Sequence, residues 1–513
     1  MMNRMGPHYT RAVRNLVAVL AAGVGATTAA CLSTPPADGM PVDATPDAPM
    51  CVDVDGDGWR GNCPTDAYQD CADGDPAIHP GAVEVGSAGA TVDRDCSGAG
   101  VTEVLALVDL TAQPLGSGGP GELGARITTR YGRYDFEARA GHQLTSVLVR
   151  TATGALSTEL LHDGPIRERN SGVHVWDDFL AVLPDDSSLV EQVSGPAVYQ
   201  ALVTYRAGGT ELDPSLSGTS LYTITMDGRI HRTDRLLLTE QPMYAGGADF
   251  PGVTSHVALA AAPAIGGTTF SHVAVRDGTT LLSDLLPTTA PGGNQIGGDQ
   301  TNWRWSCAYG PDVEVGFTRV VPGNIGQPTR NMRIYSNPTP SYRQVALQYD
   351  WQVGMGTPVV LQEGPMRGHF LITPNARSNG ECQLVEAKSN AFTRPVDVVF
   401  PPPATGTLVS DVVDDEDDDG FVEAGGYWAL RASSPAGIRF EFEQPSGTTL
   451  PLYATFRIAG VPPGRDPMVL IGGNRASQGV AYRLQPDGAD GIWMVLMIGI
   501  QAGQPIELIY PPL

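Results

Sequence analysis

The chain has 513 residues, with 56 acidic and 32 basic side chains and a formal net charge of -24. This length predicts more than one domain, and a hydrophobic content of 42% excludes a globally disordered chain. The acidity excludes nucleic acid as a partner, because phosphate binding needs clustered Lys and Arg. The only lysine is Lys388, so almost all positive charge comes from arginine.

The negative charge is concentrated in two segments. Residues 51–96 contain nine Asp and one Glu against two Arg, and residues 411–423 contain six Asp and two Glu with no basic residue. Carboxylates packed this closely repel one another unless they are solvated, protonated or neutralised by a cation. The distribution therefore indicates two cation sites on a chain of otherwise mild acidity.

Residues 1–30 have the layout of an export signal. Three arginines precede an apolar run over 16–30 that is too short for a transmembrane helix. The run ends Thr28-Ala29-Ala30-Cys31, which resembles a bacterial lipobox and implies lipidation of Cys31 after cleavage. Ordinary cleavage after the Ala-rich site is the alternative.

Residues 31–50 are Pro-rich and without apolar periodicity, as in an extended tether. Together with the signal, they predict an exported lipoprotein of the outer membrane or cell surface, held to the membrane by its lipid anchor.

The cysteine count fits an exported protein. Setting Cys31 aside leaves six cysteines, an even number suited to disulfides in an oxidising compartment. They are Cys51, Cys63, Cys71 and Cys96 in the first acidic segment, then Cys307 and Cys382. The first four contain no C-x2-C spacing, which argues against zinc, and three pairings among them stay open. We predict that Cys307 and Cys382 are bonded to each other.

The first acidic segment has the pattern of a calcium loop. Asp53, Asp55 and Asp57 alternate and Gly58 follows, as at positions 1, 3, 5 and 6 of such a loop. Position twelve is Pro64, so this is not an EF-hand. The further candidate ligands are Asp70, Asp73, Asp75, Glu84, Asp93 and Asp95.

The runs DVDGDGWRG, DCADGDPAIHPGA and DRDCSG, with Glu84 before the last, resemble the metal-binding motif of the MopE-type surface-protein family. The resemblance implies a metal-binding module over 51–98. Ala72, Gly86 and Ser97 depart from the family's pattern, so the second cation cluster is degenerate. The family also brings in copper as an alternative metal, but an oxygen-only ligand set selects calcium. His79 is the segment's one imidazole.

The second acidic segment repeats this pattern. Asp415, Asp417 and Asp419 alternate, Gly420 is sixth and Glu423 ninth. The segment is either a second calcium loop or an acidic linker between two β domains. Phe421 and the apolar residues after it favour a calcium loop seated against a core.

Short strand patterns separated by turn residues fill the rest of the chain. Asp227-Gly228 and Asp277-Gly278 each lie between two such runs, as in β-hairpins. Residues 438–443 alternate apolar and charged, and no long capped helix is expected. We predict a mainly β, multi-domain body of β-sandwich or jelly-roll type, with a large β part over 101–410 and a C-terminal β domain over 411–513.

No catalytic motif stands out. The nearest constellation is Tyr222, Arg229 and His231, with Asp234 close by, where Tyr and His could serve a polysaccharide lyase as acid and base and Arg could neutralise a uronate. Alternation puts Arg229 and His231 on one face. The alternative interpretation is an ordinary exposed face of a hairpin.

The sequence therefore favours a calcium-binding, non-catalytic surface protein with a binding or structural role. Its expected partners are the membrane, through the lipid anchor, and a polysaccharide or another surface protein. The alternatives are a surface carbohydrate-active enzyme, a lyase or hydrolase with its site in 101–410, and a copper-binding surface protein.

Overall fold

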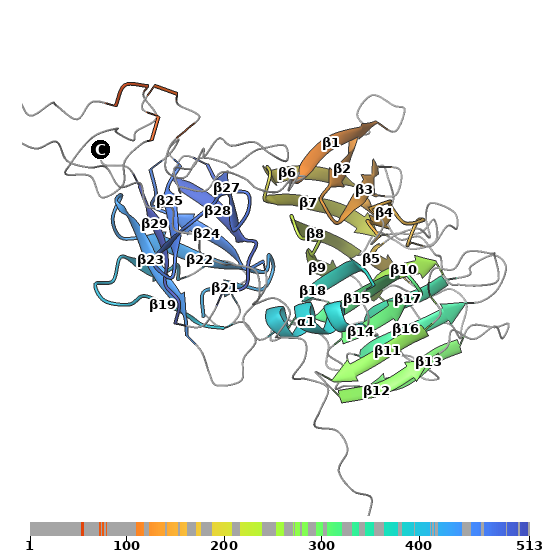
Figure 1. The fold of residues 1–513 in the computed structure, drawn as a ribbon. Helices are drawn as coiled ribbons and strands as arrows, with labels where there is room; N and C mark the ends of the chain where they lie inside the picture. Colours follow the sequence, from red (N-terminus) through yellow and green to blue (C-terminus); the bar gives the residue numbers. More distant parts are fainter. Residues whose placement is uncertain are drawn as a thin grey trace, which may run out of the picture. The chain divides into compact units, whose positions relative to one another are not determined.

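Four β-sheets hold the strands that the structure describes (Figure 1). The computed structural model describes residues 53–55, 71–72, 74–75, 78, 109–116, 123–138, 141–151, 154–161, 171–175, 187–207, 216–238, 253–260, 270, 272–277, 280–285, 294–300, 305–320, 331–337, 344–352, 364–377, 382–393, 396–410, 412, 415, 419–443, 453–462, 466–488, 490–500 and 503–510. All lie in the second of the chain's two units, 1–50 and 51–513. The sheets confirm the predicted mainly β, multi-sheet class.

Two nine-stranded antiparallel sheets form the large β part. The first has the order β1 (Thr111–Gly116), β2 (Leu123–Thr128), β3 (Gly132–Glu137), β4 (Gln143–Val149), β5 (Ser171–Val175), β10 (Val253–Ala260), β17 (Gln344–Gln352), β16 (Asn331–Asn337) and β13 (Asn294–Gln300). The second has the order β12 (Thr280–Leu285), β11 (His272–Asp277), β14 (Trp305–Tyr309), β15 (Val313–Arg319), β18 (Gly364–Ala376), β9 (Ile230–Leu238), β8 (Leu216–Thr225), β7 (Val198–Ala207) and β6 (Ser188–Ser194).

Both predicted Asp-Gly hairpins are present, as β8–β9 and β11–β12. In the first, Gly228 has φ +82°, the left-handed conformation that a tight hairpin turn needs and that glycine adopts without strain. The Gly228 N–H donates to the Thr225 carbonyl over 2.8 Å. The turn dipeptide therefore fixes where β8 ends and β9 begins.

The two large sheets pack face to face as a sandwich. Phe136 of β3 meets Tyr222 of β8 edge to face, with ring centroids 4.9 Å apart, and Tyr349 of β17 lies 5.5 Å from Phe370 of β18. All four rings are buried. Aromatic and β-branched residues on alternate positions suit such an inner face, since successive side chains point to opposite sides of a strand.

A buried ion pair of β9 lies in this core. Arg232 and Asp234 of β9 are fully buried, with the Arg232 Nε 3.2 Å from an Asp234 carboxylate oxygen. The other contacts of Asp234 come from Ser220 of β8 and Ser255 of β10, whose hydroxyls each donate over 2.6 Å. Since β10 belongs to the opposite sheet, the carboxylate links the two layers.

The C-terminal residues form a second pair of sheets. One has the order β19 (Val398–Val399), β23 (Gly437–Phe442), β29 (Ile506–Ile509), β25 (Met468–Ile471) and β26 (Asn474–Ala476). The other has the order β20 (Gly406–Leu408), β22 (Tyr427–Ala432), β24 (Thr455–Ala459), β28 (Gly491–Leu496) and β27 (Tyr482–Pro486), with β21 (Phe421–Val422) beside β22. β22 and β24 are parallel.

An aromatic cluster joins these two sheets. Trp428 stacks on Phe456 at 5.4 Å, and Phe440 of the facing sheet lies 4.9 Å from Phe456. The first two strands of this sandwich are β19 and β20, which begin at Val398 and Gly406. The sandwich therefore begins before the boundary near residue 410 that the composition indicates. The FPPPATGTLVS segment lies partly within these strands, because Pro-rich chain can pass along a sheet edge.

One helix, α1 (Gln383–Thr393), lies against β15 and β18 of the second large sheet (Figure 1). The sequence analysis did not predict it. Its buried face is Val385, Ser389 and Phe392, at spacings of four and three residues. Within the part of the chain that the structure describes, no helix is long and apolar enough to cross a bilayer.

Candidate functional site

The Cys307–Cys382 disulfide holds the start of α1 to the sheet. The bond is present as predicted, between a residue of β14 and the residue just before the helix. A carboxylate oxygen of Glu314 accepts a hydrogen bond from the Val385 N–H over 3.1 Å, which satisfies one free donor of the first helical turn. Burial raises the pKa of Glu314 to about 6. Hydrogen bonds from the backbone of Val385 and Leu384, and the charges of Lys388 and Arg377, lower it but do not outweigh burial.

The helix carries Lys388 to the β8–β9 turn. The Lys388 Nζ donates to Asn375 Oδ1 over 2.8 Å and to the Asp227 carbonyl over 3.4 Å, and it lies 3.8 Å from the Asp227 carboxylate. Its side chain is 19% exposed. The chain's only lysine is thus a largely desolvated amine beside a buried acid.

Asp227 is already paired with a second cation. The Arg229 Nε lies 2.8 Å from its carboxylate, and both side chains are buried. Burial alone would raise the pKa of Asp227, but Arg229 and Lys388 together hold it below its ordinary value. Two cations therefore share the carboxylate of Asp227. Burial lowers the pKa of Lys388. Asp227 and Glu314 raise it and Arg229 lowers it, and the net shift is downward.

A pocket of about 370 Å³ opens beside this cluster. Asp227, Asn375 and Lys388 provide its charged and amide groups, and Tyr131 and Tyr453 contribute hydroxyls that lie 2.5 Å apart in a hydrogen bond. The rest of the wall is apolar, formed by Pro374, Ala376, Leu384, Ala387, Ala391 and Phe392. We call this the Lys388 pocket. An apolar cavity of this size with a few convergent polar groups is typical of small-molecule sites.

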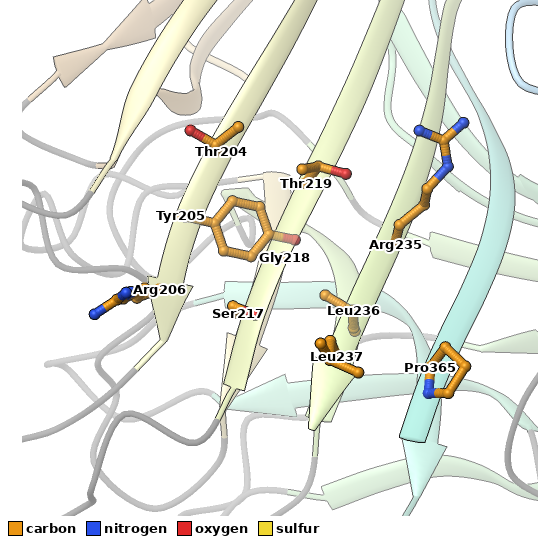
Figure 2. A pocket seen from close by; sticks show the side chains of 10 residues that line it. All are labelled: Thr204, Tyr205, Arg206, Ser217, Gly218, Thr219, Arg235, Leu236, Leu237 and Pro365. Carbon is orange, nitrogen blue, oxygen red and sulfur yellow. The ribbon is translucent and has the colours of Figure 1, made fainter. Parts of the chain in front are cut away.

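A second hollow lies elsewhere on the same sheet, across β7, β8, β9 and the start of β18 (Figure 2). Thr204, Thr219 and Arg235 form one row across three strands, as their pairing register requires. The hollow is about 560 Å³ but is open to solvent, so it would enclose a small ligand less fully than the Lys388 pocket. The Lys388 pocket is therefore the stronger candidate.

The sheet separates the three weak catalytic candidates. Arg229 and His231 share one face, as alternation predicts, and both lie against Phe392: the Arg229 guanidinium is 3.7 Å from the ring centroid, and the His231 ring centroid is 5.8 Å away. Tyr222 points into the sandwich core on the other face. All three are fully buried, so the hairpin is not the exposed face that the alternative interpretation assumed.

His231 lies beneath the turn that follows Glu423. A Cβ added to Gly426 would overlap the imidazole ring, which shows how closely the turn packs on it. Burial and then Arg229 lower the pKa of His231 to about 3, so the ring is neutral at physiological pH. This histidine fills space between α1 and the C-terminal sheets and does not face the pocket.

The second acidic loop is seated against a core, as Phe421 suggests. Phe421 is buried and packs on Trp428. One carboxylate oxygen of Asp415 accepts the Gly420 N–H over 3.0 Å, and one of Asp419 accepts the Phe421 N–H over 2.7 Å. Glu423 is buried.

Among the described residues, three carboxylates do not converge within 4.8 Å at either acidic segment. Among these described residues, the one group of three potential ligands within 4.8 Å of one another is Cys307, Glu314 and Cys382. The two cysteines of this group are bonded to each other. In the first segment, Asp53, Asp55 and Asp75 are described, and Cys71 is disulfide-bonded, as predicted. The predicted residues outside the described part of the chain are Cys31, Cys51, Cys63, Cys96, Asp57, Asp70, Asp73, Glu84, Asp93, Asp95 and Asp417.

Sequence reasoning missed the Lys388 pocket. One signal was available: a chain that otherwise uses arginine keeps a single lysine. Arginine does not deprotonate in proteins, whereas a buried lysine can, so the exception was informative. The approach of Lys388 to Asp227, 161 residues apart, was not visible in the sequence.

Neither a family model nor a curated protein matches the chain. Among solved structures, a TPR-domain containing protein from Parabacteroides distasonis aligns at TM-score 0.32 and 11% identity, over 53% of this chain and 54% of its own. Galactose 1-epimerase from Lactobacillus acidophilus aligns at TM-score 0.33 and 8% identity, over 52% and 100%. A heparan sulfate lyase from Pedobacter heparinus aligns at TM-score 0.29 and 7% identity, over 68% and 42%. At these TM-scores no function is carried over.

Proposed function

We propose that this chain is an exported surface protein that binds a small amphipathic ligand in the Lys388 pocket, without turning it over, and binds calcium through its acidic loops. The observation that carries the ligand-binding proposal is the composition of the pocket. Its wall is apolar, and its charged atoms are gathered at one place, around Asp227 and Lys388. Such a division suits a molecule with an apolar body and one polar end.

The geometry favours binding over catalysis. The carboxylate of Asp227 is committed to two cations, and the neutral His231 ring is covered by the turn at Gly426. A general base needs a free oxygen or nitrogen within hydrogen-bond reach of a substrate proton. The Asp227 carboxylate is occupied by its two cations, and His231 does not line the pocket. The pocket groups can orient a ligand while the apolar wall holds it.

Export and anchoring complete the proposal. The signal-like residues 1–30 and the lipobox-like Cys31 support a lipid anchor, and the Pro-rich residues 31–50 support a spacer between membrane and body. A polysaccharide or another surface protein is the further partner that we propose for the anchored chain. A Cys31→Ser protein should lose membrane association, whereas unchanged association and gel mobility would contradict lipidation.

Filling the pocket should abolish ligand binding. Ala387 lines the pocket from an exposed position of α1, so Ala387→Trp should occupy its volume with little effect on folding. We expect the fluorescent anion 1-anilinonaphthalene-8-sulfonate to bind the native protein and to lose at least about tenfold in affinity, about 1.4 kcal/mol, in this variant. Fluorescence titration measures both.

The matched control for that titration is Gln383→Trp, which adds the same ring to an exposed position of the same helix outside the pocket. It should leave probe affinity unchanged. Equal affinity of the native and Ala387→Trp proteins would show that the probe, and the site, lie elsewhere.

Calcium should stabilise the folded chain. A cation that binds only the native state adds about 2.7 kcal/mol at a hundred times its dissociation constant, so millimolar calcium should raise the melting temperature and a chelator should reverse it. In an Asp415→Asn, Asp419→Asn double variant the increase should shrink, whereas Asp312→Asn, at an exposed acid away from both loops, should keep it. No shift with calcium, and no calcium in elemental analysis of the purified protein, would remove this half of the proposal.

A further inference from the structure

The Lys388 pocket has a chemical property that a simple binding site does not need. Its lining includes a lysine, whereas every other member of the chain's 32 Lys and Arg residues is an arginine. An arginine at this place would pair with Asp227 at least as well, because its planar fork matches a carboxylate. What lysine adds is an amine that can lose its proton and act as a nucleophile.

The contacts of Lys388 support that role. Its strongest hydrogen bond is to a neutral group, Asn375 Oδ1, at 2.8 Å. The nearest carboxylate, at 3.8 Å, also pairs with Arg229, whose Nε lies 2.8 Å from it. Asp227 and Glu314 both favour the protonated amine, but burial, which is the largest influence on its pKa, favours the neutral one. A lysine that is desolvated and adjacent to another cation is the arrangement in which an amine becomes nucleophilic near neutral pH.

The pocket also supplies a neighbouring proton donor. In the Tyr131–Tyr453 pair one hydroxyl donates to the other, which leaves the acceptor's own O–H available to a third group. Burial and the hydrogen bond with Tyr131 raise the pKa of Tyr453, so it keeps its proton. Tyr131 and Tyr453 both line the same cavity as Lys388, where a carbonyl oxygen could accept a hydrogen bond from this pair.

We propose that Lys388 captures a small apolar aldehyde or ketone in this pocket as a reversible imine, a proposal that rests on the pocket being the ligand site. The neutral amine attacks the carbonyl carbon, a C–N bond forms, and the carbonyl oxygen takes up a proton to give a carbinolamine. Loss of that hydroxyl with a nitrogen-bound proton releases one water and leaves the C=N bond. No oxidant or reductant takes part, and addition of water reverses the step.

The pocket sets the class of ligand. A volume of about 370 Å³ admits an aromatic ring or a short alkyl chain, and the wall that receives it is apolar, formed by Leu384, Ala391 and Phe392 among others. Benzaldehyde and hexanal are suitable probes, because each has one carbonyl and an apolar body.

The test uses the full chain, benzaldehyde and sodium borohydride, which reduces an imine to a stable secondary amine. Peptide mapping by mass spectrometry locates the adduct and separates Lys388 from the chain's α-amino group. We expect one adduct at Lys388, formed about tenfold or more faster in the folded protein than in urea, because the folded pocket holds the carbonyl against the amine. Ala387→Trp should slow it to the rate of the unfolded chain, and Gln383→Trp should not.

Lys388→Arg is the second variant. It keeps a cation beside Asp227, so its melting temperature should stay close to that of the native protein, while the adduct at position 388 is lost. Equal trapping rates at Lys388 in the folded and urea-unfolded protein, or no trapping at Lys388, would overturn the imine proposal. If the fluorescent anion still binds in an Ala387-dependent way, the pocket remains a ligand site without covalent capture; if it does not bind, the proposed function fails with it.

Discussion

Asp227→Asn should destabilise the folded chain by about 3–5 kcal/mol, because it leaves the buried Arg229 guanidinium without its counter-charge. Both side chains are inaccessible to water, so solvent cannot take over the role of the carboxylate. The asparagine keeps the size of the side chain and isolates the loss of charge. Urea unfolding, with the midpoint and slope compared, measures the effect.

The matched control is Asp487→Asn. Asp487 pairs with Arg457 at 2.6 Å, a shorter contact, but the arginine is 48% exposed. An exposed pair contributes only about 0–1 kcal/mol, since water screens it. If the two variants lose equal stability, the buried cluster does not have the energetic role assigned to it.

The pH dependence of stability should also change in Asp227→Asn. The folded-state pKa of Asp227 lies below its ordinary value, so between the two values the unfolded chain binds more protons than the folded one. The stabilisation from this group is therefore complete above the ordinary value, about 4, and is lost as the pH falls below it. The native protein should show this loss, and the variant should lack Asp227's share of it.

Replacing both Cys307 and Cys382 by alanine should cost about 4 kcal/mol, because the bond closes a chain segment with a sequence separation of 75. Alanine is preferred to serine, since both positions are fully buried and a serine hydroxyl would need a partner. The helix that carries Lys388 begins next to Cys382, so probe binding in the pocket should weaken as well.

Reductant provides the control for the disulfide variant. Cys71 is also disulfide-bonded, so dithiothreitol acts on the native protein at more than one place. The difference between the native protein and the double variant, both without reductant, isolates the Cys307–Cys382 bond. A difference below about 1 kcal/mol would mean that this bond does not hold the segment in place.

Local signals in the sequence predicted several of the strands. Asp227-Gly228 and Asp277-Gly278 located two hairpins, because Asp and Gly favour tight turns between strands. The strand expected over 438–443 is β23, at Gly437–Phe442. The Cys307–Cys382 bond followed from counting the cysteines of the chain.

Long-range packing was not predictable in the same way. Helix α1 was missed because Ser389 interrupts its buried face and Leu384 is exposed, so the apolar period is weak. Alternation placed Arg229 and His231 on one face, but it could not show that α1 and the turn at Gly426 cover that face. The Lys388 pocket likewise depends on a long-range contact, that of Lys388 with Asp227, which local sequence patterns do not show.

The most direct test of the central claim is an NMR titration of protein labelled with 13C at the lysine Cε. With one lysine in the chain, the spectrum contains one side-chain signal. We predict that it titrates below the ordinary lysine pKa, about 10.4, and that its shift changes when 1-anilinonaphthalene-8-sulfonate is added to the native protein but not to Ala387→Trp. An ordinary pKa together with a signal that the probe leaves unmoved would contradict the assignment of the Lys388 pocket as the ligand site.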